Sequence, residues 1–166
     1  MMMSKIKGAL SGARLTDVLV TGFIDNDERP ARFHALWRVV YFEFDNMWLK
    51  MAVVGDSGRI RLSLVDEVSN EADLLDDDML PALSSVRLQV LRDPDGSNVL
   101  ATLRTWNTNQ SPEWIECSAA RLDLVNGQQI FVDPLNYFGI QLGGREQEEV
   151  WKENAQESWL ESVEIV

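Results

Sequence analysis

The sequence predicts an α+β protein, mainly an antiparallel β-sheet with meander and hairpin connections and a C-terminal amphipathic helix packed on it. Two observations predict this fold: short runs in which apolar and polar residues alternate, and turn-forming residues between those runs. The chain has 166 residues, a usual size for one domain, and 45% of them are hydrophobic. We therefore expect a single domain over residues 1–166 with a substantial core.

The alternation is clearest at Ile60, Leu62 and Leu64, which are separated by polar residues. A period of two is typical of a strand with one buried and one exposed face. The same alternation predicts further strands at residues 86–90, 121–124 and 138–142. In residues 36–44 the alternation changes phase, since Arg38 and Glu43 would lie on opposite faces of a regular strand. This change indicates either a β-bulge near Val40 or a strand that is partly covered on both faces.

Turn-forming residues separate these runs at short intervals. The turns are expected at Asp45-Asn46, Gly55-Asp56-Ser57-Gly58, Asp93-Pro94-Asp95-Gly96 and Asn126-Gly127. Strands joined by such short turns pair antiparallel. We therefore predict a meander through residues 34–65 and hairpins near residues 86–106 and 120–133.

Helical spacing appears mainly at the C-terminal end. Trp151, Ala155, Trp159 and Val163 recur every four residues among Glu and Gln, which predicts an amphipathic helix from about residue 145 to 162. Residues 72–83 indicate a short helix or a turn, which Pro81 would end or kink. Residues 6–15 contain two glycines and indicate a short helix or an irregular lead-in.

Cysteine content and apolar run length bear on the compartment. Cys117 is the only cysteine, so no intramolecular disulfide can form. No charged segment followed by an apolar run opens the sequence, and runs such as residues 51–54 are far shorter than a membrane helix. We expect a cytoplasmic protein with no membrane partner.

The formal net charge is -12 and the pI is about 4.4. Phosphate binding depends on clustered Lys and Arg, so this charge argues against nucleic acid and anionic membranes as partners. Acidic residues concentrate in residues 66–78 and in residues 146–166. Such runs either keep a protein soluble or bind a basic partner.

Several patterns suggest chemistry, yet each has a simpler structural interpretation. Gly55-Asp56-Ser57-Gly58 has the residues that surround a serine-protease nucleophile, but it lies between two apolar runs and predicts a turn. His34 is the only histidine, so no site with two imidazoles can form, and it is expected to be an ordinary strand residue. The spacing in residues 93–98 does not fit a calcium loop. We expect no catalytic residue, no metal site and no cofactor, and hence not an enzyme.

Small size, acidic charge and the lack of catalytic residues are typical of an immunity protein or antagonist, which neutralises a toxin or other basic effector by direct binding. Trp106 and Trp114 flank a polar segment and would either anchor such a partner or close one end of the sheet. The predicted partner-binding residues are Asp73, Asp76, Asp77, Asp78, Trp106, Trp114, Glu146, Glu148, Glu149, Glu153 and Glu157.

Three other classes of function stay open. A secretion-type chaperone or adaptor is also small and acidic; it would form a homodimer and hold an extended segment of its client along an exposed strand or groove. A mimic of nucleic acid fits less well, because the first third of the chain mixes basic with acidic residues. An enzyme would have to assemble its site from one His, one Cys and scattered carboxylates.

Overall fold

The computed structural model describes residues 1–70, 76, 78–136 and 138–166. Its helical elements are α1 (Met2–Leu10), α2 (Arg87–Val90), α3 (Arg145–Asn154) and the 3-10 turn η1 (Glu157–Trp159). Its strands are β1 (Leu15–Asp25), β2 (Arg32–Phe44), β3 (Met47–Val53), β4 (Ile60–Val65), β5 (Met79–Ser85), β6 (Leu100–Trp106), β7 (Asn109–Gln110), β8 (Ile115–Cys117), β9 (Ala119–Leu124), β10 (Gln129–Asn136), β11 (Gly139–Gly143) and β12 (Ser162–Glu164).

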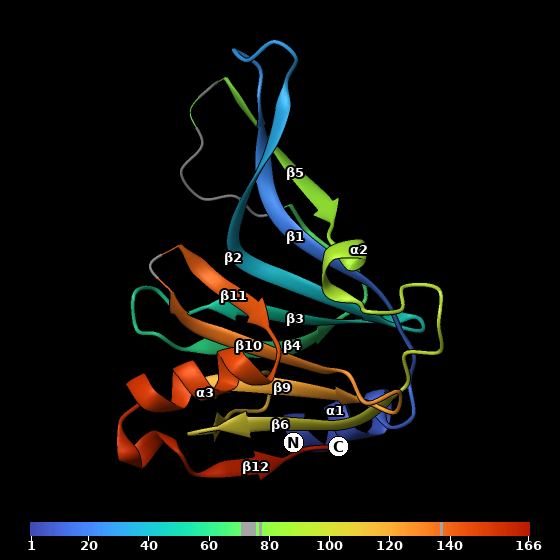
Figure 1. Cartoon of the computed structure of the whole chain (residues 1–166), viewed down its shortest axis with the longest axis vertical. Helices are drawn as coiled ribbons and strands as arrows, with labels where there is room; N and C mark the ends of the chain where they lie inside the picture. The colour runs from blue at the N-terminus through green and yellow to red at the C-terminus, as the bar shows by residue number, and fades with distance from the viewer. Residues whose placement is uncertain (71–75, 77, 137) are drawn as a thin grey trace.

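The described strands form two antiparallel sheets (Figure 1). A seven-stranded sheet has the order β5-β1-β2-β3-β4-β8-β7, and a five-stranded sheet has the order β11-β10-β9-β6-β12. Helix α3 packs on β10 and β11. The predicted antiparallel α+β fold and the packing of the C-terminal helix on a sheet are therefore confirmed. No helix in the described part of the chain is long and apolar enough to cross a membrane.

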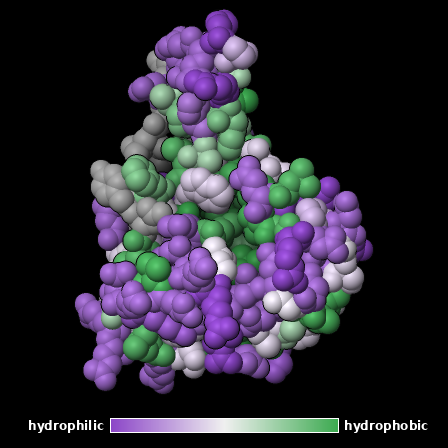
Figure 2. All heavy atoms as spheres, viewed as in Figure 1, coloured by the Kyte–Doolittle hydropathy of each residue, from purple (hydrophilic) through white to green (hydrophobic). Residues whose placement is uncertain are grey.

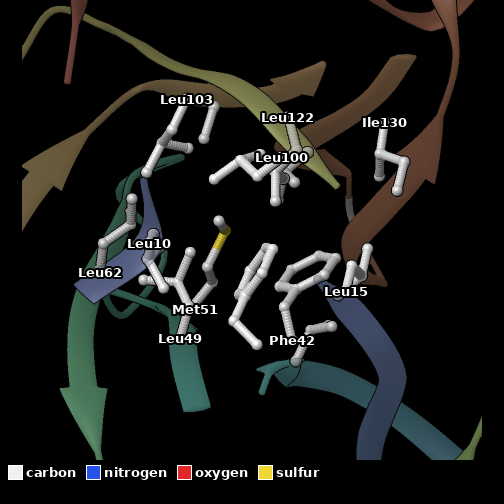
Figure 3. Packing of buried hydrophobic residues seen from close by; sticks show 14 of the residues in the cluster. Leu10, Leu15, Phe42, Leu49, Met51, Leu62, Leu100, Leu103, Leu122 and Ile130 are labelled. Atoms are coloured by element: carbon white, nitrogen blue, oxygen red, sulfur yellow. The ribbon is translucent and has the colours of Figure 1, made fainter. Parts of the chain in front are cut away.

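The main core lies between the two sheets (Figure 3). Leu49 and Met51 are two residues apart on β3, so both point to the core face, and both are fully buried. Leu103 and Leu122 face them from the five-stranded sheet, and α1 contributes Leu10. The opening segment is therefore a helix that helps to close the core.

A second apolar cluster lies between the other face of the five-stranded sheet and α3. It consists of Trp106, Ala119, Phe131 and Trp151. The ring of Phe131 lies 5.6 Å from that of Trp106 and 5.8 Å from that of Trp151. The five-stranded sheet is thus covered on both faces.

Strands β1, β2 and β5 continue beyond the two stacked sheets as a projecting arm, seen at the top of Figure 1. A bulge in β2 marks the base of the arm, because residues 36–39 lie opposite Thr21 alone in the pairing with β1. Trp37, inside this bulge, has a left-handed φ of 56°. The bulge adjoins Val40, which agrees with the first of the two interpretations of the change of phase in the sequence.

Two of the three strand arrangements predicted from short turns were confirmed. β2, β3 and β4 form the meander through residues 34–65, and β9 and β10 form the hairpin at residues 120–133. Gly55-Asp56-Ser57-Gly58 is the turn between β3 and β4, and Asn126-Gly127 is the turn between β9 and β10.

The predictions for residues 86–106 were wrong. Arg87–Val90 forms α2 and not a strand: Val86 and Leu91 are buried on either side of a helical turn, whereas Leu88 is 73% exposed. No hairpin joins this segment to β6, because β6 pairs with β9 and β12 instead.

The C-terminal helix is shorter than predicted. α3 ends at Asn154, and Ala155 already has an extended backbone. Ser162–Glu164 forms β12, which pairs with β6, so the expected helix gives way to a strand. Within residues 72–83, residues 72–75 and 77 lie outside the described residues, and the described part from Met79 onward is strand β5 rather than a helix.

Candidate functional site

The tip of the arm brings together carboxylates from two distant segments of the chain. Asp25 ends β1, Asp27 follows in the turn, and Asp78 directly precedes β5. The backbone N–H of Asn26 donates to the carbonyl oxygen of Asp78 at 3.1 Å, which holds the two segments side by side. Asp76 is also exposed at this end of β5.

The carboxylates at the tip repel one another. The pKa of Asp27 is raised, first by the negative charge of Asp78 and then by desolvation and the charge of Asp25. Asp25, Asp27 and Asp78 form no ion pair with any described residue. Nearby Glu28 differs: Arg32 donates to it at 2.9 Å, and this hydrogen bond lowers the pKa of Glu28. The tip therefore gathers three carboxylates that no described basic residue pairs directly, with Arg29 in the same turn donating to the carbonyl oxygen of Asn26.

His34 lies in the arm, and its contacts are those of a residue that stabilises the fold. Its ring stacks on Phe23 with centroids 5.1 Å apart, and its Nε2 lies 2.9 Å from Glu28 Oε1. Cys117 lies in the main core, where burial raises the pKa of its thiol to about 12. Such a thiol is a poor nucleophile.

Ser57 donates its hydroxyl to the carbonyl oxygen of Val54 at 2.5 Å, within the β3–β4 turn. This hydroxyl therefore stabilises the turn.

An apolar hollow lies at the base of the arm, between the β2 bulge, α2 and β11. Its volume is about 410 Å³, and Trp37, Val90, Phe138, Ile140 and Leu142 contribute its apolar lining. Figure 2 shows apolar residues gathered in the hollow below the arm. β11 is the edge strand of its sheet and pairs with β10 alone among the described strands. An edge strand beside an apolar hollow can accept an extended peptide.

Another hollow, of about 690 Å³, lies beside the β3–β4 turn. Two basic side chains line it, Arg38 and Arg59. Arg59 is already paired, because its Nε donates to Glu116 at 3.0 Å and its other nitrogens donate to Ser118 and to the carbonyl oxygen of Asn107. Arg38 donates to the carbonyl oxygen of Gly55 at 3.3 Å. Arg38 therefore braces the turn, and Arg59 ties the end of the turn to β8 and to the residue after β6.

Two of the predicted partner-binding residues are buried, which corrects their interpretation as surface contacts. Trp106 would need to be exposed to anchor a partner, but it is 3% exposed, because α3 covers it with Trp151. Glu148 is 4% exposed and accepts hydrogen bonds from Arg121 at 3.1 Å and from Lys152 at 2.7 Å. Burial opposes ionisation of Glu148, but these hydrogen bonds outweigh it and lower its pKa.

The other predicted residues occupy separate surfaces. Asp76 and Asp78 are exposed at the arm, while Asp73 and Asp77 lie outside the described residues. Trp114 is half-buried beneath Arg61, whose guanidinium lies 4.5 Å from the ring centroid. The other predicted acids near the C-terminus are exposed, namely Glu146, Glu149 and Glu153 on α3 and Glu157 on η1. Figure 1 places α3 at the end of the molecule opposite the arm tip, so the two predicted acidic patches are separate.

Sequence reasoning missed Asp25 and Asp27 as part of the tip. Asp25-Asn26-Asp27 follows an apolar run and precedes another, which is a signal for an acidic hairpin turn. No signal in the sequence indicated that this turn meets Asp78. Among the described residues, no group of three or more His, Cys, Asp or Glu is arranged to hold a metal ion.

The chain was compared with protein-family models, with curated proteins and with solved structures, and none of the three comparisons found a match. Any statement about function therefore depends on the geometry described above.

Proposed function

We propose that this protein is a non-catalytic antagonist, such as an immunity protein, that binds and neutralises a cytoplasmic toxin or effector with a basic surface. The observation that carries the proposal is the convergence of Asp25, Asp27 and Asp78 at the tip of a projecting arm. Their mutual repulsion would be relieved by Lys or Arg side chains of a partner.

The shape of the arm suits this role. It extends the negative charge away from the stacked sheets, where it can enter a recess of a partner (Figure 1). Carboxylates at a projecting tip also attract a basic partner over a distance and speed association. The tip is built on paired strands, and Gly22 and His34 show how closely these approach: a Cβ on Gly22 would overlap the carbonyl oxygen of His34. A charge pattern on such a support is preorganised for binding.

An affinity capture tests the proposal. The tagged protein is used to capture partners from a lysate of its source cells, first at low and then at raised salt, and the bound proteins are identified by mass spectrometry. We expect a basic protein that elutes as salt is raised. The variant D25N/D27N/D78N should lose this partner because the tip charge is gone.

The matched control removes three charges from the other acidic surface. E146Q/E149Q/E153Q changes exposed residues of α3 and should retain the partner. Equal capture by the wild type and the tip variant would refute the proposal. Loss of capture only in the α3 variant would move the interface from the arm to α3.

A secretion-type chaperone or adaptor is the second candidate, and the apolar hollow beside β11 favours it. An extended client segment would pair with β11 and place apolar side chains in the hollow. F138S, at a residue that is 76% exposed, should weaken capture of an apolar client segment. The same variant should not change the salt concentration at which a basic partner elutes. Sedimentation separates the two classes further, because a chaperone of this type is expected to be a homodimer.

A further inference from the structure

Asp133 on β10 is a buried carboxylate with an unusual environment. It is 5% exposed, and Glu148 is the other buried acid among the described residues. The Oδ1 atom of Asp133 accepts from the backbone N–H of Leu135 at 2.8 Å, and its Oδ2 atom accepts from Gln147 Nε2 at 2.6 Å. Glu148 pairs with Arg121 and Lys152, whereas Asp133 contacts no basic side chain in the described part of the chain.

The electrostatic contrast between the two acids follows from these partners. Burial raises the pKa of Asp133, although the hydrogen bonds from Leu135 and Gln147 act in the opposite direction. The pKa of Glu148 is lowered because two cations outweigh its burial. A buried carboxylate without a cation is costly, so Asp133 is a position where a cation from outside would be strongly favoured.

Asp133 lines a pocket of about 480 Å³ between β10, β11 and α3. The pocket is open to solvent past two exposed apolar residues, Leu135 at 40% and Val150 at 48% exposure. Gln141, Gln147 and Asn154 also line it. Gln147 donates one amide N–H to Asp133 and Asn154 donates one to the carbonyl oxygen of Val150, and no described residue donates to the amide oxygens of these two residues.

Several hydrogen-bond acceptors line this pocket. An arginine guanidinium carries five N–H donors in a planar fork and no acceptor. Asp133 can still accept at both oxygens, and the amide oxygens of Gln147 and Asn154 add two more acceptors. The apolar rim fits the aliphatic stem that precedes a guanidinium.

We propose that this pocket, with Asp133 at its base, receives the arginine side chain of a protein partner. The inference rests on the proposed function only in taking a basic protein as the source of that arginine. It adds a second contact to the arm tip, on the part of the molecule where β10, β11 and α3 meet.

The test is a ¹H–¹⁵N NMR titration of the full chain with N-acetyl-arginine amide. Trp151 lines the pocket and its indole N–H has no hydrogen-bond partner among the described residues, so its assigned signal reports on occupancy. We expect this signal to shift with the arginine probe and to stay in place with N-acetyl-citrulline amide, which is neutral and nearly isosteric. D133N should weaken the arginine probe by about tenfold or more, because a charge-assisted pair is lost. The control E153Q should bind within about twofold of the wild type.

Other outcomes overturn the proposal. Equal shifts with citrulline, or unchanged affinity in D133N, would refute a cation site at Asp133. Equal affinity for N-acetyl-lysine amide would refute the assignment to arginine. If D133N does not fold, V150W at the half-exposed rim should block the probe, and unchanged binding to V150W would refute the pocket.

The pocket and the proposed function can fail separately. If D133N captures the basic partner as well as the wild type, while the arm-tip variant does not, the pocket is refuted and the proposed function survives. If the arginine probe binds at Asp133 but no basic partner is captured, the pocket stands and the proposed function is refuted.

Discussion

Glu148 fastens α3 to the five-stranded sheet. It accepts hydrogen bonds from Arg121 on β9, Lys152 on its own helix and Gln129 on β10. Trp151 packs beside it in the second apolar cluster. The helix is thus held by a charged network next to an aromatic one, and removing the charge of Glu148 should loosen both.

We predict that E148Q destabilises the protein by about 2 kcal/mol at neutral pH, because Arg121 and Lys152 lose a shared buried partner. The lowered pKa of Glu148 means that its contribution is present above its ordinary pKa and is lost as pH falls through its folded-state pKa. Urea unfolding at pH 7 and near pH 3 should therefore show a gap between variant and wild type that narrows in acid. E153Q, exposed on the same helix, should stay within about 0.5 kcal/mol of wild type. A gap of equal size at both pH values would contradict this account.

Whether the burial of a single side chain could be predicted depended on how far along the chain the covering element lies. Glu148 lies three residues before Trp151, on the same face of the helix, so helical periodicity could have placed it toward the sheet. The burial of Trp106 was not readable in this way. Its cover, α3, comes from much later in the chain, and the neighbouring polar segment indicated exposure.

At the scale of elements, β11 meets the β2 bulge at one close crossing. Gly139 has a φ of 107°, and a Cβ there would overlap the carbonyl oxygen of Trp37. This contact joins the end of the five-stranded sheet to the base of the arm. It also sets one boundary of the apolar hollow, since Trp37 lines that hollow.

G139A should destabilise the protein by at least about 2 kcal/mol, because a side chain is strained at this φ and would collide with backbone. The matched control is G8A in α1, where a Cβ meets nothing within 4 Å. There the change should stabilise the protein by about 0.5 to 1 kcal/mol, since alanine favours the helix. Chemical denaturation of both variants checks the pair, and a neutral G139A would show that the crossing can open.

Elements were predictable where their partners are close in sequence. The meander at residues 34–65 and the hairpin at residues 120–133 follow from tight turns between neighbouring strands. The predicted helix ran to about residue 162 because Val163 continues the four-residue spacing of Trp159, but Ser162–Glu164 pairs with the edge of β6 instead. α2 was read as a strand because four residues cannot distinguish a short strand from a single helical turn.

At the scale of the whole molecule, the acidic charge is divided between the arm tip and α3. The amino-acid sequence located both acidic segments but could not show that Asp25 and Asp27 join Asp78, because strand pairing between β1 and β5 brings them together. The two groups also differ in kind. The tip acids repel one another, whereas Glu149 on α3 pairs with Arg145 at 3.7 Å and Glu146 lies in the first turn, where a helix favours negative charge.

This difference predicts how salt affects stability. Raising NaCl from about 0.01 M to about 0.1 M shortens the Debye length from about 30 Å to about 10 Å, which screens repulsion between exposed charges. The Tm of the wild type should therefore rise with salt. D25N/D27N/D78N should have a higher Tm than the wild type at low salt and a smaller rise, because the repulsion has been removed.

The α3 variant E146Q/E149Q/E153Q removes the same number of charges and should not raise the Tm at low salt, since it also removes favourable interactions with Arg145 and the helix terminus. Thermal unfolding of the three proteins over this salt range distinguishes the two explanations. If both variants raise the Tm equally, the repulsion belongs to the total charge of the molecule. If only the tip variant does, the strain is concentrated at the arm, where a basic partner would relieve it on binding.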